Sequence, residues 1–490
     1  MTTRTVSRRE LLGGGLALAA AALLPARPAP AAAGDLDFAS ALDAARAIRT
    51  GKVSSVELCT RMLARIGQFN PKLNAIVTLT PDAALARARE ADQARARGDL
   101  WGPFHGVPIT IKDTYEVDGV RTTAGMPSLK DNVSPRDAVV VARLKRAGAV
   151  ILGKTNVPVA AMDWQSFNPI FDRTNNPWDL SRTPGGSTGG GAAALAAGLS
   201  YLETGSDLGG SIRIPSHFCG VFGHKPTLDL VPMRGHIPPP PGIPATPPST
   251  LPVAGPLARS ASDLRAAMET LGGPDVAEAR AYRWTLPAPR RASLRDYRIG
   301  YVLDHPRCPV SSELAGPLAA AVEALRKAGA TLEEGWPPGV KADEQYGAYM
   351  FLLQELYVPD QGNRPIKELL AMDGRRRGAR GIWQAWFRDH DAFLMPTAFV
   401  PAFPHDPSPN IAARVLATPS GPRPYLDLTF WIAFASLAGL PATTAPVGLT
   451  SGGLPVGIQI VGPYLEDATP IDLAGRLSDV IGGFRPPPGY

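Results

Sequence analysis

Residues 205–216 read Gly205-Ser-Asp-Leu-Gly-Gly-Ser211-Ile-Arg-Ile-Pro-Ser216 and place a serine directly after two glycines. Upstream, Thr183-Pro-Gly-Gly-Ser187-Thr-Gly-Gly190 forms a glycine-rich turn that opens onto a helix of small residues. A third stretch, Val107-Pro-Ile-Thr-Ile-Lys112-Asp113, has the apolar alternation of a strand and carries a lysine where water is expected to be scarce. We interpret Lys112, Ser187 and Ser211 as parts of one active site.

The three stretches together resemble the amidase signature family, whose members hydrolyse amides with a Ser–cisSer–Lys triad. Lys112 precedes Ser187 by 75 residues and Ser187 precedes Ser211 by 24, which matches the spacing of the family. The resemblance implies that Ser211 is the nucleophile, that Ser187 relays its proton, and that Lys112 is the base. It also implies a cis peptide bond at Gly186–Ser187.

The chemistry explains why such residues are needed. A serine hydroxyl is a poor nucleophile, so the site must remove its proton and stabilise the oxyanion that forms on the amide carbonyl. A lysine can be the base if desolvation lowers its pKa from ~10.4 to ~7–8, and the isoleucines on either side of Thr110 predict such an environment. Leu208, Gly209 and Gly210 are the candidate oxyanion hole, because glycines let main-chain N–H groups approach the oxygen.

Four neighbouring residues complete the local prediction. Thr188 and Gly191 stand where the family most often has serine. Threonine keeps the hydroxyl, and we expect the glycine to affect packing more than proton transfer. Asp207 and Arg213 are expected to hold the loop through charge-assisted hydrogen bonds.

The rest of the chain predicts an α/β fold. Strands are expected at 107–111 and 150–153 with a helix at 137–147 between them, which is the alternation of a largely parallel sheet. Length alone suggests about three domains of ~150 residues, but no repeat or linker divides the chain. The resemblance extends over about 34–480, and we predict one amidase domain at 34–490, a mixed, mostly parallel sheet covered by helices.

The N-terminus indicates export. Ser7-Arg8-Arg9-Glu10-Leu11-Leu12 resembles a twin-arginine motif, and the apolar run at 11–24 is shorter than the ~20 residues that a membrane-spanning helix needs. Residues 1–33 are therefore predicted to be a signal peptide, leaving a periplasmic or secreted enzyme with no membrane span. An uncleaved anchor or a disordered tail is the alternative.

Composition limits the partners. The net charge of +6 falls to +3 without residues 1–33, and no basic run with interleaved aromatics remains, which argues against nucleic-acid binding. Cys59, Cys219 and Cys308 show no disulfide or metal spacing and are expected to be buried thiols. We expect no metal and no cofactor, a small-molecule amide as substrate, and a monomer or homodimer.

Three competing interpretations stay open at this point. Gly185–Gly189 also fits G-x-S-x-G, the nucleophile elbow of α/β-hydrolases, but that motif needs an apolar strand where residues 179–184 are polar. Such an esterase would also need a histidine, and only His217 and His224 lie near the serines. The second is an amidotransferase subunit, which passes ammonia to a partner protein and works on charged tRNA. The export signal argues against this interpretation. The third is a scaffold without activity, against which the three intact positions argue.

The sequence does not identify the substrate, and an amide, an ester and a carbamate each fit the predicted chemistry. Segments 237–250 and 340–390 are expected to shape the pocket. The first is proline-rich and predicts a loop, because proline lacks the backbone donor. The aromatic run at 343–357 predicts a helix that either faces the core or lines a site for an apolar acyl group.

Overall fold

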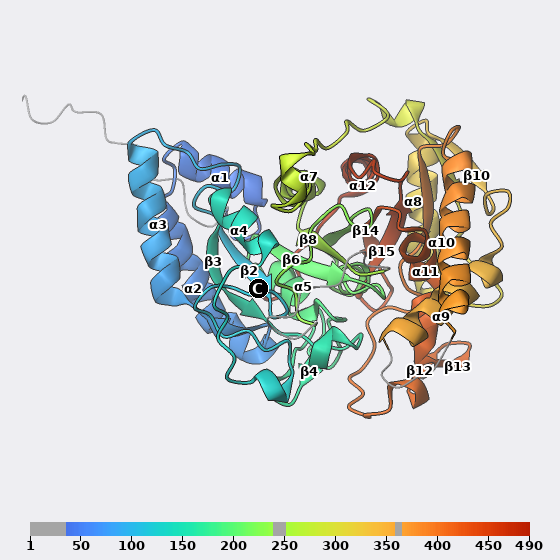
Figure 1. The fold of residues 1–490 in the computed structure, drawn as a ribbon, viewed down its shortest axis with the longest axis horizontal. Helices are drawn as coiled ribbons and strands as arrows, with labels where there is room; N and C mark the ends of the chain where they lie inside the picture. The colour runs from blue at the N-terminus through green and yellow to red at the C-terminus, as the bar shows by residue number, and fades with distance from the viewer. Residues whose placement is uncertain (1–35, 239–250, 358–364) are drawn as a thin grey trace, which may run out of the picture.

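One mixed sheet of eleven strands runs through the molecule, with helices packed around it (Figure 1). The computed structural model describes residues 36–238, 251–357 and 365–490, so the predicted signal peptide and most of the proline-rich loop lie outside the described residues. In sheet order the strands are β1 (Ile76–Leu79), β3 (Val150–Thr155), β2 (Pro108–Lys112), β6 (Leu202–Asp207), β8 (Val253–Ala258), β7 (Phe222–Lys225), β14 (Ala442–Leu449), β15 (Pro455–Val461), β11 (Ala392–Pro396), β9 (Arg298–Tyr301) and β10 (Thr331–Glu334).

The predicted α/β class and the mixed sheet are confirmed, but the expected majority of parallel strands is wrong. Four neighbouring pairs are parallel, β2 with β3, β2 with β6, β9 with β11 and β9 with β10, whereas the other six are antiparallel. The reason lies in the connections. A short turn joins β14 to β15, and such turns link only antiparallel neighbours, whereas parallel pairs need longer crossovers.

Twelve α-helices lie in the described part of the chain, and the two helices predicted at 137–147 and 343–357 are both among them. The Ser54 side chain accepts from the Glu57 N–H and the Glu57 carboxylate accepts from the Ser54 N–H, which forms a capping box at the start of α2. The helices are α1 (Ala41–Arg49), α2 (Ser55–Leu73), α3 (Pro81–Ala96), α4 (Val139–Arg146), α5 (Gly189–Ala196), α6 (Arg213–Cys219), α7 (Ala261–Leu271), α8 (Ser312–Lys327), α9 (Ala342–Tyr357), α10 (Ile366–Trp386), α11 (Thr429–Ala438) and α12 (Ala468–Ile481).

The helices fall into groups along the sheet. In Figure 1, α1 to α4 gather at the blue end of the molecule and α8 to α11 at the opposite, orange end. The strands β2, β3 and β6 are buried along their whole length, as expected for strands covered on both faces. Two small hairpins lie outside the main sheet, β4 (Phe167–Asn168) with β5 (Asp172–Arg173), and β12 (Val415–Thr418) with β13 (Gly421–Pro424).

The candidate site lies where two parallel strands end. Lys112 is the last residue of β2 and Asp207 the last of its neighbour β6, and carboxyl ends of parallel strands meet at one edge of a sheet. Helix α5, which follows Ser187, packs closely on this region through glycine. A Cβ at Gly191 would lie 2.4 Å from Cγ of Glu203, so the absence of serine at this position makes room for a buried glutamate.

Candidate active site

The three predicted residues come together in a buried site. Lys112 Nζ lies 2.7 Å from Ser187 Oγ and 3.0 Å from Ser206 Oγ. The loop of Ser211 adjoins that of Ser187, because the Thr188 N–H donates to the Ser211 carbonyl at 3.2 Å. The exposed fraction rises from 0% at Lys112 to 1% at Ser187 and 9% at Ser211. A substrate can therefore reach Ser211 first, while Lys112 stays dry.

Burial controls the charge of Lys112. Desolvation lowers the pKa of its ammonium to about 7, against the opposing effect of the nearby Asp207 and Glu203 carboxylates. This agrees with the value that the sequence predicts for a lysine at the end of an apolar strand. The neutral amine is therefore well populated near neutral pH, and a neutral amine has the lone pair that a base needs.

A second buried lysine on the next strand provides a contrast. Lys154 Nζ lies 3.3 Å from a carboxylate oxygen of Asp113 and donates to the Tyr115 carbonyl at 2.7 Å and to Thr122 Oγ1 at 2.9 Å. Among the described residues, Lys112 has only hydroxyl groups within hydrogen-bond distance. Burial lowers the pKa of Lys154 as well, but there the ion pair with Asp113 favours the charged amine, whereas Lys112 has no such ion pair among the described residues.

The Ser187 loop has the backbone that the resemblance implies. The Gly186–Ser187 peptide bond is cis, and Gly185 has a φ of +90°. A Cβ at Gly186 would lie 2.5 Å from the Asp163 carbonyl oxygen, so this position requires glycine. The loop is thus pressed against residues 163–165, which form one wall of the site.

The loop before Ser211 is held by a buried ion pair, as predicted. Arg213 Nε and Nη2 donate to the two carboxylate oxygens of Asp207 at 3.0 and 2.8 Å, and both side chains are fully buried. Arg213 also donates to the Ile432 carbonyl, to Ser436 Oγ and to Gln459 Oε1. Its positive charge lowers the pKa of Asp207 to about 2, although burial acts in the opposite direction as the larger single influence.

The candidate oxyanion hole needs one correction. The Gly210 N–H donates to Asp207 Oδ1 at 3.0 Å, so it holds the loop and does not face a substrate oxygen. Within the described part of the chain, the N–H groups of Leu208, Gly209 and Ser211 donate to no protein acceptor. These three are the donors left for an oxyanion, and Gly210 itself has a φ of +90° that favours glycine.

Two aromatic side chains border this loop. Trp164 Nε1 donates to the Gly209 carbonyl at 2.7 Å, and the Tyr349 hydroxyl donates to the Leu208 carbonyl at 3.3 Å. Tyr349 is on α9, so that helix both fills the core and reaches the site. Beside Trp164, the Asp163 carboxylate pairs with Arg414 at 2.6 Å, which anchors this wall to the C-terminal half.

The two histidines near the serine motifs form hydrogen bonds with residues outside the candidate site. His217 accepts from the Gly457 N–H at 2.7 Å and lies 3.1 Å from the Val400 carbonyl, and burial lowers its pKa to about 4. His224 lies 3.1 Å from a carboxylate oxygen of Asp467 and 2.9 Å from Thr443 Oγ1. Residues 174–188 form no strand, so the nucleophile elbow is also without its required structure.

Two further residues, Ser206 and His236, are hydrogen-bonded around Lys112 and carry no clear signal in the sequence. Ser206 lies within the Gly205–Ser216 stretch, where the adjacent Asp207 and Ser211 have the more evident roles. His236 Nε2 lies 2.9 Å from Ser206 Oγ, yet it stands in Arg234-Gly-His with no motif around it. Only the fold brings it to the end of β6.

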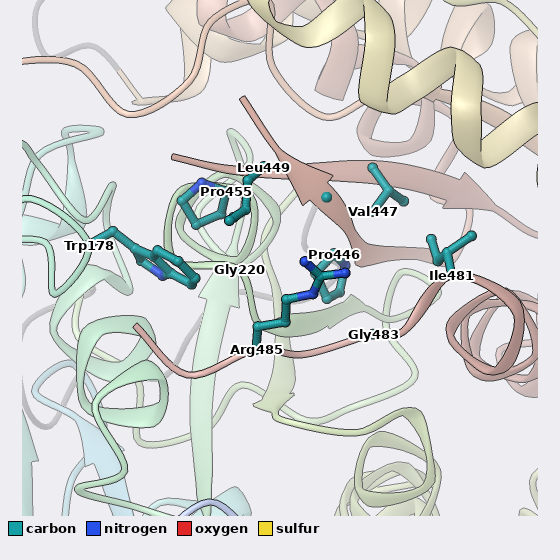
Figure 2. A pocket seen from close by; sticks show the side chains of 10 residues that line it. Trp178, Gly220, Pro446, Val447, Leu449, Pro455, Ile481, Gly483 and Arg485 are labelled. Carbon is teal, nitrogen blue, oxygen red and sulfur yellow. The ribbon is translucent and has the colours of Figure 1, made fainter. Parts of the chain in front are cut away.

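A separate hollow lies away from these residues. Figure 2 shows it between Trp178, the β14–β15 region and the segment after α12, and Arg485 is its one ionisable lining residue. It contains none of the three predicted catalytic residues. In the described ranges, no group of three or more His, Cys, Asp or Glu side chains could hold a metal, and the helices include none long and apolar enough to cross a bilayer. The three cysteines are buried thiols, as predicted.

Comparison with known proteins gives the family. The model of the family described as Amidase matches residues 57–358 and 351–470. A glutamyl-tRNA(Gln) amidotransferase subunit of Moorella thermoacetica is 32% identical over 90% of this chain and 96% of its own. A solved amidase is 29% identical, with a TM-score of 0.73 over 91% of this chain and 100% of that one. A bacterial aryl acylamidase of the amidase signature family has the same fold, with a TM-score of 0.75 at 22% identity over 93% of this chain and 99% of that one.

This chain therefore belongs to the amidase signature family. More particularly, it is an amidase-family enzyme that acts on carbon–nitrogen bonds.

Proposed function

We propose that this enzyme hydrolyses a linear carboxylic amide to an acid and an amine or ammonia, through an acyl-enzyme on Ser211. The observation that carries the proposal is the 2.7 Å contact between the buried Lys112 amine and Ser187 Oγ, beside the Ser211 loop. Esters and carbamates present the same carbonyl and fit the same chemistry.

The proposed reaction begins with attack of Ser211 Oγ on the amide carbonyl carbon. The Ser211 proton passes to Ser187 Oγ, and the Ser187 proton passes to Lys112 Nζ. The carbonyl oxygen becomes an oxyanion that accepts from the N–H groups of Leu208 and Gly209. The proton on Lys112 then returns through Ser187 to the leaving nitrogen, the C–N bond breaks, and water repeats the cycle on the ester of Ser211.

The surroundings of Ser211 support a substrate with an apolar acyl part. Trp164 and Tyr349 both hydrogen-bond to carbonyls of the loop before Ser211, and of the two only Trp164, 9% exposed like Ser211, keeps any accessible surface. Aromatic side chains with their polar ends already paired offer apolar faces to a ligand.

The test of the proposed function is a substrate panel with one acyl group. Residues 34–490, purified alone, are expected to hydrolyse the anilide, the primary amide and the ester of a short arylalkyl acid, with kcat of about 1–10³ s⁻¹ for the best of them. Acid and amine should appear in equal amounts by chromatography. Turnover of the ester with no turnover of either amide would contradict amide hydrolysis.

A second candidate function comes from the relatives, an amidotransferase component that releases ammonia to a partner. The 32% identity to the Moorella protein along almost the whole chain favours it. The panel separates the two candidates, because an amidase needs no partner protein for turnover, whereas a component that passes ammonia to a partner does. Hydrolysis of anilides without any partner supports the amidase, and strict dependence on added partner proteins supports the amidotransferase.

We further propose that the enzyme is exported in folded form through residues 1–33. Replacing Arg8 and Arg9 together with lysine is expected to leave nearly all of the protein as full-length precursor in the cytoplasm, because the paired guanidinium groups are the recognised signal. Fractionation and immunoblotting of the two compartments measure this. Mature protein in the periplasm or medium at the wild-type level would show that another signal is used.

A further inference from the structure

A histidine that the proposed chemistry does not use continues the Lys112 network behind the base. Ser206 Oγ lies 3.0 Å from Lys112 Nζ and 2.9 Å from His236 Nε2. The ring of His236 meets that of Tyr115 edge-on, with centroids 4.9 Å apart. The Tyr115 hydroxyl donates to the Gly205 carbonyl at 2.8 Å, so it is committed as a donor to the strand that carries Ser206.

The other ring nitrogen of His236 fixes its tautomer. His236 Nδ1 lies 3.1 Å from the Pro238 carbonyl oxygen, and a carbonyl can only accept. The hydrogen of the neutral ring is therefore on Nδ1, and Nε2 has a free lone pair. Burial and the nearby Lys112 lower the pKa of His236 to about 3, so the ring is neutral near neutral pH. Nε2 thus accepts the hydrogen of the Ser206 hydroxyl.

This direction matters for the base. A neutral amine has one lone pair, and it must point at the Ser187 hydroxyl to receive a proton. If the Ser206 hydroxyl donated to Lys112, that lone pair would be occupied. Because Ser206 donates to His236, its oxygen can only accept from an N–H of Lys112, which leaves the lone pair for Ser187.

We propose that His236 is a positioning residue that turns the Ser206 hydroxyl away from Lys112 and so directs the lone pair of the base at Ser187. The inference rests on the proposed function, since it assumes that Lys112 is the base. His236 itself touches neither of the two serines of the triad in this role, and acts only through Ser206.

The test compares two substitutions with matched shape. His236→Phe keeps an aromatic ring against Tyr115 but has no acceptor, and kcat for the best amide is expected to fall about tenfold, the loss expected from one misdirected hydrogen bond. His236→Gln keeps an acceptor for Ser206 and should stay within about threefold of the wild type. KM should change little in both, because the residue lies behind the base.

The decisive measurement is the double variant. Ser206→Ala removes the hydroxyl that would occupy the Lys112 lone pair, so His236→Phe/Ser206→Ala is expected to be faster than His236→Phe alone. If His236 had only a structural role, the losses in kcat from His236→Phe and Ser206→Ala would add in the double variant, and that result would overturn the proposal. His390→Ala, which removes a ring bonded to Trp386 and Glu333, is the control. If Lys112→Ala retains activity, the proposed function is wrong. If Lys112→Ala is inactive while His236→Phe is fully active, only the inference about His236 is wrong.

Discussion

Ser211→Ala is expected to abolish amide hydrolysis, with kcat falling by about 10⁴-fold or more, as in other enzymes that lose a serine nucleophile. The residue is the most exposed of the three, and its own N–H and those of Leu208 and Gly209 donate to no acceptor among the described residues, which leaves them for an oxyanion. Without Ser211 Oγ no acyl-enzyme can form, and the proton relay through Ser187 has nothing to activate. Steady-state rates with the best amide of the panel measure the loss.

Covalent labelling provides the complementary measurement. A fluorophosphonate or sulfonyl fluoride should add one adduct to the wild type, on the peptide that carries Ser211, and none to Ser211→Ala. Ser187→Ala is the matched control, because it keeps the nucleophile and loses only the relay, so labelling should be slower but still at Ser211. A stoichiometric adduct on Ser187 with Ser211 unmodified would reverse the two assignments.

Lys112→Ala is the second large effect, and we expect it to lower kcat by about 10³-fold, within the range for loss of a general base. Lys112→Arg should be no better, because guanidinium stays protonated and has no lone pair to offer. In the wild type, activity should rise with pH along a limb centred near 7, where burial places the pKa of Lys112, far below the ordinary 10.5. Initial rates between pH 5 and 10 would test all three expectations.

The fold should survive this substitution. Between pH 7 and 10.5 the unfolded chain binds more protons at Lys112 than the folded one does, so this lysine makes wild-type stability rise with pH across that interval. Lys112→Ala should lack that rise and be no less stable at neutral pH. The neighbouring Glu203 is not left as an unpaired charge, because burial raises its pKa to about 8. Near wild-type rates in a natively folded Lys112→Ala, shown by circular dichroism, would exclude the triad.

The sequence was sufficient for the parts of the site that local patterns encode. Glycines before a serine, a lysine within an apolar strand, and the paired Asp207 and Arg213 all have a local physical reason, and the structure brings them together. His236 could not be found this way, because its partner Ser206 is 30 residues earlier and only the packing of the loop on β6 makes them neighbours. The direction of the central strands was missed for a similar reason, since it depends on which strands the turns connect.

The contacts of Arg213 make the structure of the N-terminal half of the chain depend on the C-terminal half. Its guanidinium has acceptors on α11 and β15, between 219 and 246 residues further along, and these elements carry none of the proposed chemistry. A fragment that ended after β8 would contain all three triad residues and the Asp207–Arg213 ion pair, but the guanidinium would lose its three distant acceptors, and a hydrogen bond to a charged group contributes about 1.5–3 kcal/mol. The reactive segment is therefore not a module that evolution can transplant by itself. Any descendant that inherits the serines must also inherit the distant half, whose acceptors orient the loop that carries Ser211.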